Sequence, residues 1–195
     1  MRRVVAAEFV SLDGVMEDPG GVEGFVHGGW TIPFWSDELA EYQSEQLFAS
    51  DALLLGRRTY EVFAAAWPSR SGDPFTDRMN SLPKLVVSTT LSEPLKWNAR
   101  LVEGDPVESV RGLKQEPGQD LLIYGSGTLV QTLLRHGLID SYRLMVYPVV
   151  LGSGKRLFAA ETARADLRLT STKTTSSGVA MLTYEAAEDS AADAG

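Results

Sequence analysis

Short apolar stretches recur along the first two thirds of the chain and are separated by segments whose apolar residues follow helical spacing. Stretches rich in Val, Leu and Ile and bounded by turn residues are typical of buried strands. This pattern predicts strands at 2–10, 51–55, 84–88 and 120–124. The segments between them predict helices at 36–49, 60–66, 105–114 and 129–135.

Residues at the expected helix ends support this assignment. Ser36 is a good N-cap, and Asp105 followed by Pro106 combines an N-cap with the residue preferred at the first helical position. Gly137 is placed to end the last of these helices. We expect Gly56–Thr59 (GRRT) to form a tight turn that leads into the second helix.

The pattern changes after residue 139, where strands follow one another without intervening helices. Three strands are expected, at 140–147, 166–173 and 179–185. Strands alternating with helices, followed by a strand-rich end, predict an α/β fold with a mixed central sheet, helices on both faces and an antiparallel C-terminal edge. One domain is expected over 1–186, with a disordered acidic tail over 187–195.

Composition excludes several classes of function. The 195 residues contain no cysteine and two histidines, so disulfides, thiolate metal sites and a histidine-rich metal site are not expected. The net charge of −8 argues against general affinity for nucleic acid. No apolar run is long enough for a membrane span, and no secretory signal follows the N-terminus, so we expect a cytoplasmic protein.

Three strand ends carry residues suited to binding phosphate. In open α/β sheets ligands bind outside the carboxyl ends of the strands, and helix N-termini there offer free N–H groups. Glycines let the backbone approach a ligand, and arginines pair with a phosphomonoester. Together these segments predict a dinucleotide site for NADP rather than NAD, although the same residues also suit ordinary turns and caps. The candidate residues are Gly56, Arg57, Arg58, Thr59, Ser88, Thr89, Thr90, Gly125, Ser126, Gly127 and Thr128.

A long Gly-rich loop over 15–35 separates the first strand from the first helix. Loops of this length inside a domain are more often functional than accidental. Its aromatic residues Trp30, Phe34 and Trp35 either wall a site for a planar heterocycle or pack into the core.

Five segments resemble the dihydrofolate-reductase-like superfamily, and most closely the family of the riboflavin-biosynthesis reductase domain. They are FVSLDGVMEDP at 9–19, DALLLGRRTYEVF at 51–63, KLVVSTTL at 84–91, DLLIYGSGTLVQTLL at 120–134 and LIDSYRLMVYPVVLGSGKRLF at 138–158.

The resemblance implies an NADPH-dependent reductase that forms a homodimer. By resemblance, residues 56–59 hold cofactor phosphates, residues 88–90 face the 2′-phosphate, and Gly125–Leu129 cradle the pyrophosphate. Gly152 lies near the ribose, and the loop containing Asp13 and Gly14 borders the nicotinamide and the substrate. The zinc deaminase domain of the bifunctional riboflavin proteins needs a longer chain and cysteines, so this chain corresponds to the reductase half.

The implied reaction is hydride transfer from NADPH to a C=N or C=O carbon of a small-molecule substrate. The product also needs a proton, and Asp13, Asp37 and water are the candidate sources. Two other functions remain open at this stage: a dimeric nucleotide-binding module without turnover, and an interaction protein without a cofactor.

Overall fold

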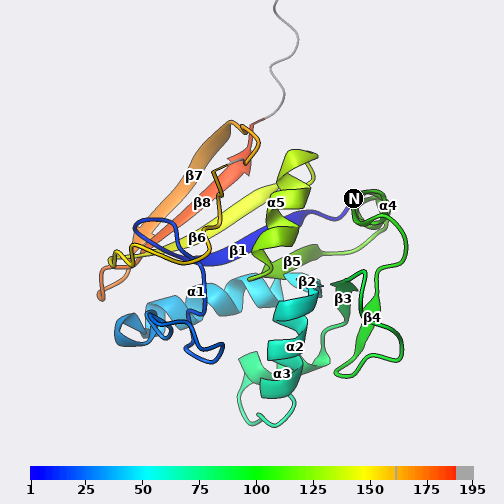
Figure 1. Cartoon of the computed structure of the whole chain (residues 1–195), viewed down its shortest axis with the longest axis horizontal. Helices are drawn as coiled ribbons and strands as arrows, with labels where there is room; N and C mark the ends of the chain where they lie inside the picture. Colours follow the sequence, from blue (N-terminus) through cyan, green and yellow to red (C-terminus); the bar gives the residue numbers. More distant parts are fainter. Residues whose placement is uncertain (161, 188–195) are drawn as a thin grey trace, which may run out of the picture.

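The computed structural model describes residues 1–160 and 162–187, which fold around one eight-stranded sheet with the strand order β4-β3-β2-β5-β1-β6-β8-β7 (Figure 1). The first six strands in chain order are parallel, whereas β8 runs antiparallel to its neighbours β6 and β7. The predicted α/β fold with an antiparallel C-terminal edge is therefore confirmed. The strands are β1 Val4–Ser11, β2 Ser50–Gly56, β3 Lys84–Val87, β4 Ala99–Leu101, β5 Asp120–Tyr124, β6 Ser141–Tyr147, β7 Leu167–Thr174 and β8 Ala180–Ala186.

Side chains of the central strands alternate between two apolar layers. Leu54 of β2 packs into the larger core cluster together with residues of α4 and α5, and Leu53 packs into a second cluster on the opposite face with residues of α1, α2 and α3. Both leucines are fully buried. The predicted placement of helices on both faces follows from this alternation, because strands apolar on both sides need cover on both sides.

The helix caps form as their residues indicate. Ser36 accepts a hydrogen bond from the Leu39 N–H, and Asp105 accepts from the N–H groups of Val107 and Glu108. The helices are α1 Asp37–Phe48, α2 Arg57–Ala66, α3 Pro74–Ser81, α4 Pro106–Gln115 and α5 Gly127–Arg135, with a 3-10 turn at Ile32–Phe34.

Two differences from the expected elements concern helices. The tight turn expected at Gly56–Thr59 is absent, because Gly56 is extended and α2 begins directly at Arg57. Helix α3 was not predicted within a Ser- and Gly-rich segment, although its cap repeats the Asp-Pro signal: Asp73 precedes Pro74 and accepts from the Thr76 N–H.

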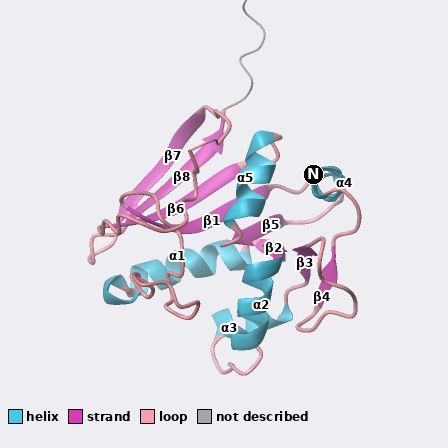
Figure 2. Cartoon of the chain, viewed as in Figure 1, coloured by secondary structure: helices cyan, strands magenta, loops and turns pink. Residues whose placement is uncertain are grey.

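The long loop between β1 and α1 is drawn in pink in Figure 2. One buried carboxylate, that of Asp18, orders it. Asp18 is 2% exposed and accepts hydrogen bonds from the N–H groups of Val22 and Phe25. Burial alone raises the pKa of Asp18, but these and other backbone N–H groups outweigh it and lower the pKa overall. The loop is thereby held beside the carboxyl ends of the parallel strands. The expected disordered tail lies outside the described residues except for Ala187, whose N–H donates to Asp166.

Candidate functional site

The carboxyl ends of β2, β3 and β5 meet at one large cavity of about 1030 Å³. The three strand-end segments suggested by the sequence all line it: Gly56–Thr59, Ser88–Thr90 and Gly125–Leu129. The parallel direction of these strands brings the segments to the same edge of the sheet. The long loop adds Met16–Gly20, Val22 and Glu23 to the lining.

Two of these segments are joined to each other by hydrogen bonds. The Ser126 hydroxyl accepts from the Gly56 N–H at 2.9 Å and donates to the Tyr124 carbonyl at 3.2 Å. The Ser126 N–H in turn donates to the Thr59 hydroxyl at 2.9 Å. The starts of α2 and α5 therefore stand side by side at the cavity, and both helix N-termini present backbone N–H groups there.

The turn into α5 needs glycine for two physical reasons. Gly125 has φ +57°, in the left-handed region that favours glycine. A Cβ at Gly127 would lie 2.5 Å from the Met16 sulfur, so a larger residue would displace the Met16 side chain, which also lines the cavity.

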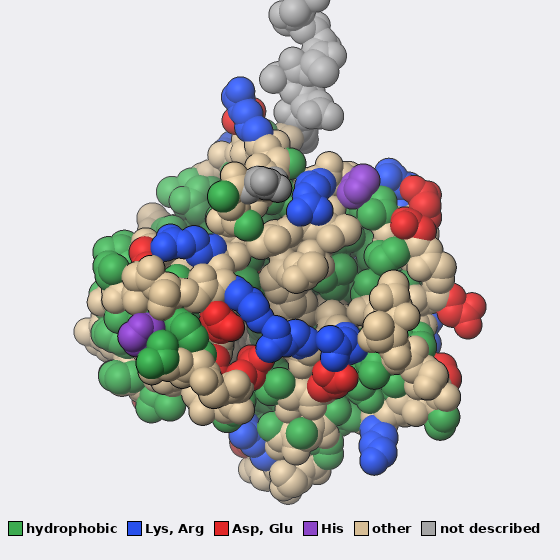
Figure 3. Space-filling view, viewed as in Figure 1, with side chains coloured by type: hydrophobic (Ala, Val, Ile, Leu, Met, Phe, Trp, Pro, Cys, Tyr) green, Lys and Arg blue, Asp and Glu red, His purple; other side chains and the backbone are tan. Residues whose placement is uncertain are grey.

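Cationic side chains stand at the rim of the cavity, each beside an acid. The pairs are Arg57–Glu61 at 3.0 Å, Arg58–Glu23 at 4.0 Å and Lys155–Glu17 at 3.6 Å, with Arg156–Asp13 at 3.7 Å nearby. Lys and Arg side chains gather in a row across the middle of one face, with Asp and Glu beside them (Figure 3). Exposed pairs of this kind contribute little energy, so the cations can exchange these partners for a bound phosphate.

Apolar side chains form much of the remaining wall. Phe63, Trp67 and Phe75 come from α2, its C-terminal end and α3, and Trp35 comes from the long loop. The Arg70 guanidinium stacks 4.9 Å above the Trp67 ring. The cavity thus combines a polar rim suited to phosphates with an aromatic interior suited to flat rings.

The predicted substrate-facing aromatics divide between the cavity and the core. Trp35 lines the cavity. Trp30 is 6% exposed and donates from its indole to the Glu17 carbonyl, and both Trp30 and Phe34 pack edge-on against Tyr147. The structure therefore gives Trp30 and Phe34 the core role that the sequence left open.

Asp13, Gly14 and Gly152 lie together in a loop junction and not among the residues that line the cavity. Asp13 accepts from the Ser11 hydroxyl at 2.7 Å and from the Leu151 and Gly152 N–H groups. The Ser11 hydroxyl, followed by the Leu151 N–H, lowers the pKa of Asp13 to about 2. Asp13 is thus an ionised acceptor that joins two loops, a poor source of a proton.

Asp37 is also not among the residues that line the cavity and lies in the exposed first turn of α1. There its charge favours the helix N-terminus, which is the structural role that the sequence allowed for it. Neither acid suggested by the sequence therefore reaches the cavity.

Sequence reasoning missed Glu8, which lies in the middle of β1 and lines the cavity. Its side chain is 2% exposed, and its Oε1 has no hydrogen-bond partner among the described residues. Burial raises the pKa of Glu8 well above its usual value, against a smaller lowering by the Gly125 backbone. The available signal was a single acid inside the otherwise apolar segment VVAAEFV.

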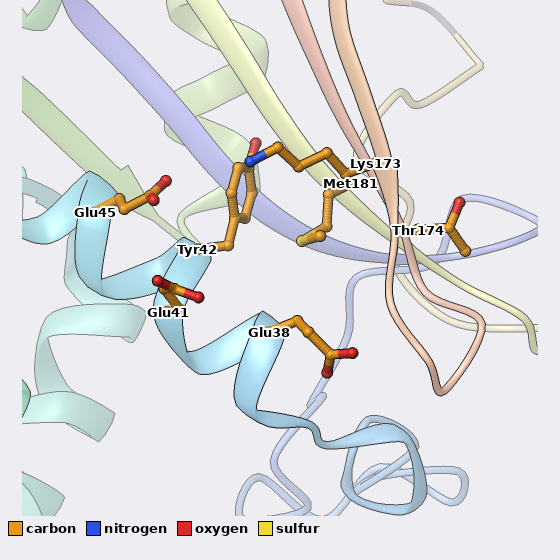
Figure 4. A pocket seen from close by; sticks show the side chains of 7 residues that line it. All are labelled: Glu38, Glu41, Tyr42, Glu45, Lys173, Thr174 and Met181. Atoms are coloured by element: carbon orange, nitrogen blue, oxygen red, sulfur yellow. The ribbon is translucent and has the colours of Figure 1, made fainter.

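A smaller cavity of about 220 Å³ lies between α1 and the strands β7 and β8 (Figure 4). Its lining includes Glu38, Glu41 and Glu45 from one side of α1, with Lys173 of β7 across from them. The Ser36 hydroxyl, with smaller contributions that include Ser176, lowers the pKa of Glu38 to about 2. The lining of this groove contains no glycine and one aromatic residue, Tyr42, and three of its seven residues are acids. The large cavity is therefore the candidate site.

Neither a cluster of metal ligands nor a membrane-spanning helix occurs in the described part of the chain. Over residues 1–160 and 162–187 no three His, Cys, Asp or Glu side chains gather as metal ligands would. No helix there has the length and apolar character needed to cross a bilayer.

Comparison with known sequences gives a match over almost the whole chain. The family model of the RibD C-terminal domain matches residues 2–181. Two Bacillus subtilis proteins are each 31% identical to this chain: YyaP over 188 residues, 94% of both chains, and YwjB over 173 residues, 88% of this chain and 91% of the other.

Solved structures share the fold at lower sequence identity. A Shewanella sp. PV-4 protein assigned to riboflavin biosynthesis aligns with TM-score 0.75 and 21% identity, covering 95% of this chain and 99% of that one. A pyrimidine reductase-like protein from Corynebacterium diphtheriae aligns with TM-score 0.66 and 14% identity, covering 96% and 93%. A Thermotoga maritima deaminase/reductase aligns with TM-score 0.64 and 15% identity, with 95% of this chain covering 57% of that one.

Proposed function

The chain belongs to the RibD C-terminal domain family, and on this premise we propose that it is an NADPH-dependent reductase acting on a small planar heterocycle with a C=N or C=O bond. The main observation in support of this proposal is that three strand-end segments line one cavity. The Thermotoga maritima neighbour is named as a 5-amino-6-(5-phosphoribosylamino)uracil reductase. That name supports reductase chemistry and supplies the first substrate to test.

The donor set at the cavity fits a phosphorylated dinucleotide. The first turns of α2 and α5 offer backbone N–H groups, and glycine at 125 and 127 brings the backbone close to the cavity. Backbone donors at helix N-termini are well suited to a pyrophosphate. The cavity volume is at the upper end of the range of about 300–1,000 Å³ for small-molecule sites.

The proposed preference for binding NADPH over NADH rests on polar residues at the rim of the cavity. Thr89 and Thr90 present exposed hydroxyls at the end of β3. The Ser88 hydroxyl already accepts from the Thr90 and Leu91 N–H groups, which fixes the shape of this turn. Hydroxyls beside the arginines at the start of α2 supply donors for one additional phosphate.

The bound cofactor would supply a hydride, and the protein would supply position and a dry environment. Trp35, Phe63 and Phe75 line the cavity with apolar surface that excludes water around a flat ring. Excluding water strengthens the polar interactions that orient the reacting groups.

The first test is a titration of the protein with NADPH and, separately, with NADH. Quenching of the cavity residues Trp35 and Trp67 reports binding. We expect Arg58→Ala to weaken NADPH binding by roughly 10- to 100-fold, the range for losing one charge-assisted hydrogen bond. Arg111→Ala is the matched control, because Arg111 is similarly exposed and is paired with Glu108 on α4 away from the cavity.

The titration separates the proposal from its alternatives. Preference for NADPH that falls with added salt and with Arg58→Ala supports the phosphate site, since salt screens exposed charges. Equal, weak binding of both nucleotides that is insensitive to Arg58→Ala would refute the cofactor assignment. Binding without oxidation of NADPH would leave a nucleotide-binding module, as the sequence also allowed.

Turnover is then followed as oxidation of NADPH in the presence of 5-amino-6-(5-phosphoribosylamino)uracil and, separately, of 7,8-dihydrofolate. Reaction with either compound identifies the substrate class. The homodimer and the cytoplasmic location expected from the sequence remain predictions.

A further inference from the structure

Glu8 is a buried carboxyl that lines the candidate site and has no counter-ion among the described residues. It lies on the central strand β1, where Ala7 pairs with Tyr124 of β5 and Glu8 itself pairs with Leu144 of β6. Gly125, the next residue of the β5 chain, begins the turn into α5. This register sets Glu8 beside the turn that is the proposed pyrophosphate cradle.

The ionisable groups around Glu8 do not neutralise a negative charge there. No ion pair to Glu8 occurs within residues 1–160 and 162–187, and the Glu8 Oε1 is left without a partner. The pKa of Tyr124 on the neighbouring strand β5 is raised, mostly by burial. The ionisable groups on the elements near Glu8 also include Asp120 of β5, Tyr142, Arg143 and Tyr147 of β6, and Glu17, Asp18, Lys155 and Arg156 of the loops.

The acids at positions 17, 18 and 23, which also line the cavity, have hydrogen-bond or ion-pair partners. Asp18 accepts several backbone N–H groups, Glu17 accepts from the Lys155 N–H and faces its ammonium, and Glu23 faces Arg58. For Asp18 these N–H groups outweigh burial and lower the pKa, which makes it a poor proton donor. Glu8 differs from these acids because it has no ion-pair partner and an unpartnered Oε1 among the described residues, and it lines the cavity. Burial without a cation favours the protonated form of a carboxyl, which can donate its O–H to a ligand.

We propose that Glu8 is the proton donor of the reduction, a role that rests on the proposed function. Hydride adds to the carbon of the substrate C=N or C=O bond, and the π electron pair moves onto the nitrogen or oxygen. The O–H bond of Glu8 breaks to give that atom its proton. The product has a new C–H and a new N–H or O–H bond, the cofactor is left oxidised as NADP⁺, and the Glu8 carboxylate regains a proton from water.

The central experiment compares Glu8→Gln with Glu45→Gln. The first variant keeps size and hydrogen bonding but removes the transferable proton. The second makes the same chemical change on α1, in the smaller groove outside the site. We expect Glu8→Gln to fold, to bind NADPH within about threefold of wild type and to lose roughly 10²–10⁴ in turnover, the range for general-acid catalysis. Glu45→Gln should retain wild-type turnover.

The pH profile gives a readout that a structural role would not move. Wild-type turnover should fall as the pH rises through the pKa of Glu8, and Glu8→Gln should lose this limb of the profile. Glu8→Asp retains an acid one methylene shorter and should recover part of the rate. Full turnover in Glu8→Gln with an unchanged profile would overturn the assignment.

Infrared difference spectroscopy tests Glu8 without turnover. Wild type at pH 7 should show the C=O band of a protonated buried carboxyl, which is absent in Glu8→Gln and shifts when NADP⁺ is added. Absence of this band at pH 7 would overturn the inference even if the protein reduces a substrate. If the band is present and shifts but neither test compound oxidises NADPH, the proposed substrate class fails and the neutral cavity acid stands.

Discussion

Lys84 offers a direct test of how burial controls charge in this protein. It begins β3, its side chain is fully buried, and its Nζ donates to the Asn80 carbonyl at 2.9 Å. The ammonium also lies 3.9 Å from the centre of the Trp97 ring. Burial lowers the pKa of Lys84 from 10.5 to about 8, whereas both contacts favour the charged form.

The sign of the pH effect follows from the two pKa values. Below pH 8 the lysine is charged in both states, and the folded protein carries the full cost of burying the ammonium. Between pH 8 and 10.5 the unfolded chain binds more protons than the folded one, so stability rises with pH. At about 1.4 kcal/mol per pKa unit, raising the pH from 7 to 10 adds about 2–3 kcal/mol through this group.

Replacing the lysine isolates this contribution. Lys84→Met keeps an unbranched apolar side chain and removes the titrating group, although it also leaves the Asn80 carbonyl without its ammonium donor. The free energies of unfolding of wild type and Lys84→Met are measured by urea denaturation at pH 7, 8.5 and 10. The difference between them should shift in favour of wild type by about 2–3 kcal/mol over this range.

The matched control is Lys96→Met, because the Lys96 side chain is exposed. Its difference from wild type should stay constant with pH within about 0.5 kcal/mol, as is usual for surface substitutions. Other titrating groups contribute equally to wild type and variant and cancel in the comparison. A Lys84→Met difference that is flat between pH 7 and 10 would show that the folded protein solvates the ammonium and would refute the reasoning.

Two further substitutions test the turn into α5 and the core. Gly127→Ala places a Cβ 2.5 Å from the Met16 sulfur. We therefore expect its NADPH affinity in the fluorescence titration to fall by roughly tenfold or more, which corresponds to about 1.4 kcal/mol of lost binding free energy. The control is Gly112→Ala on α4, whose Cβ meets nothing within 4 Å and which should bind NADPH with wild-type affinity. Leu54→Ala opens a cavity in the fully buried centre of β2 and should lower the free energy of unfolding by about 3–5 kcal/mol in urea, and a loss under 1 kcal/mol would contradict the packing described for the sheet.

Local chemistry determined much of this fold. Asp105, followed by Pro106, marks the start of α4 because a side-chain cap and a fixed φ act within one turn of the chain. The strand at 120–124 was predicted with its exact bounds because its apolar run is bounded by polar residues on both sides. Helix α3 had the same Asp-Pro signal at 73–74 and could have been predicted from it.

The sequence also indicated which segments approach the site. Glycines, hydroxyls and arginines at three strand ends suggested one phosphate-binding region, because parallel strands direct their carboxyl ends to a common edge. The fold then brought all three segments to one cavity. The sequence could not show that Arg57 and Arg58 stand in the first turn of a helix, because the chain enters α2 directly from an extended Gly56.

Only the tertiary structure decided the state of each acid. Glu8 lies within β1 and Asp13 lies just after it. Asp13 meets the Leu151 N–H, 138 residues away in the sequence, and stays ionised. Glu8 meets no cation among the described residues and is buried, so its pKa is raised. Hydrophobic pattern and caps act between near neighbours and can be read along the chain. Charge state depends on solvent and on partners distant in sequence, which only folding brings together.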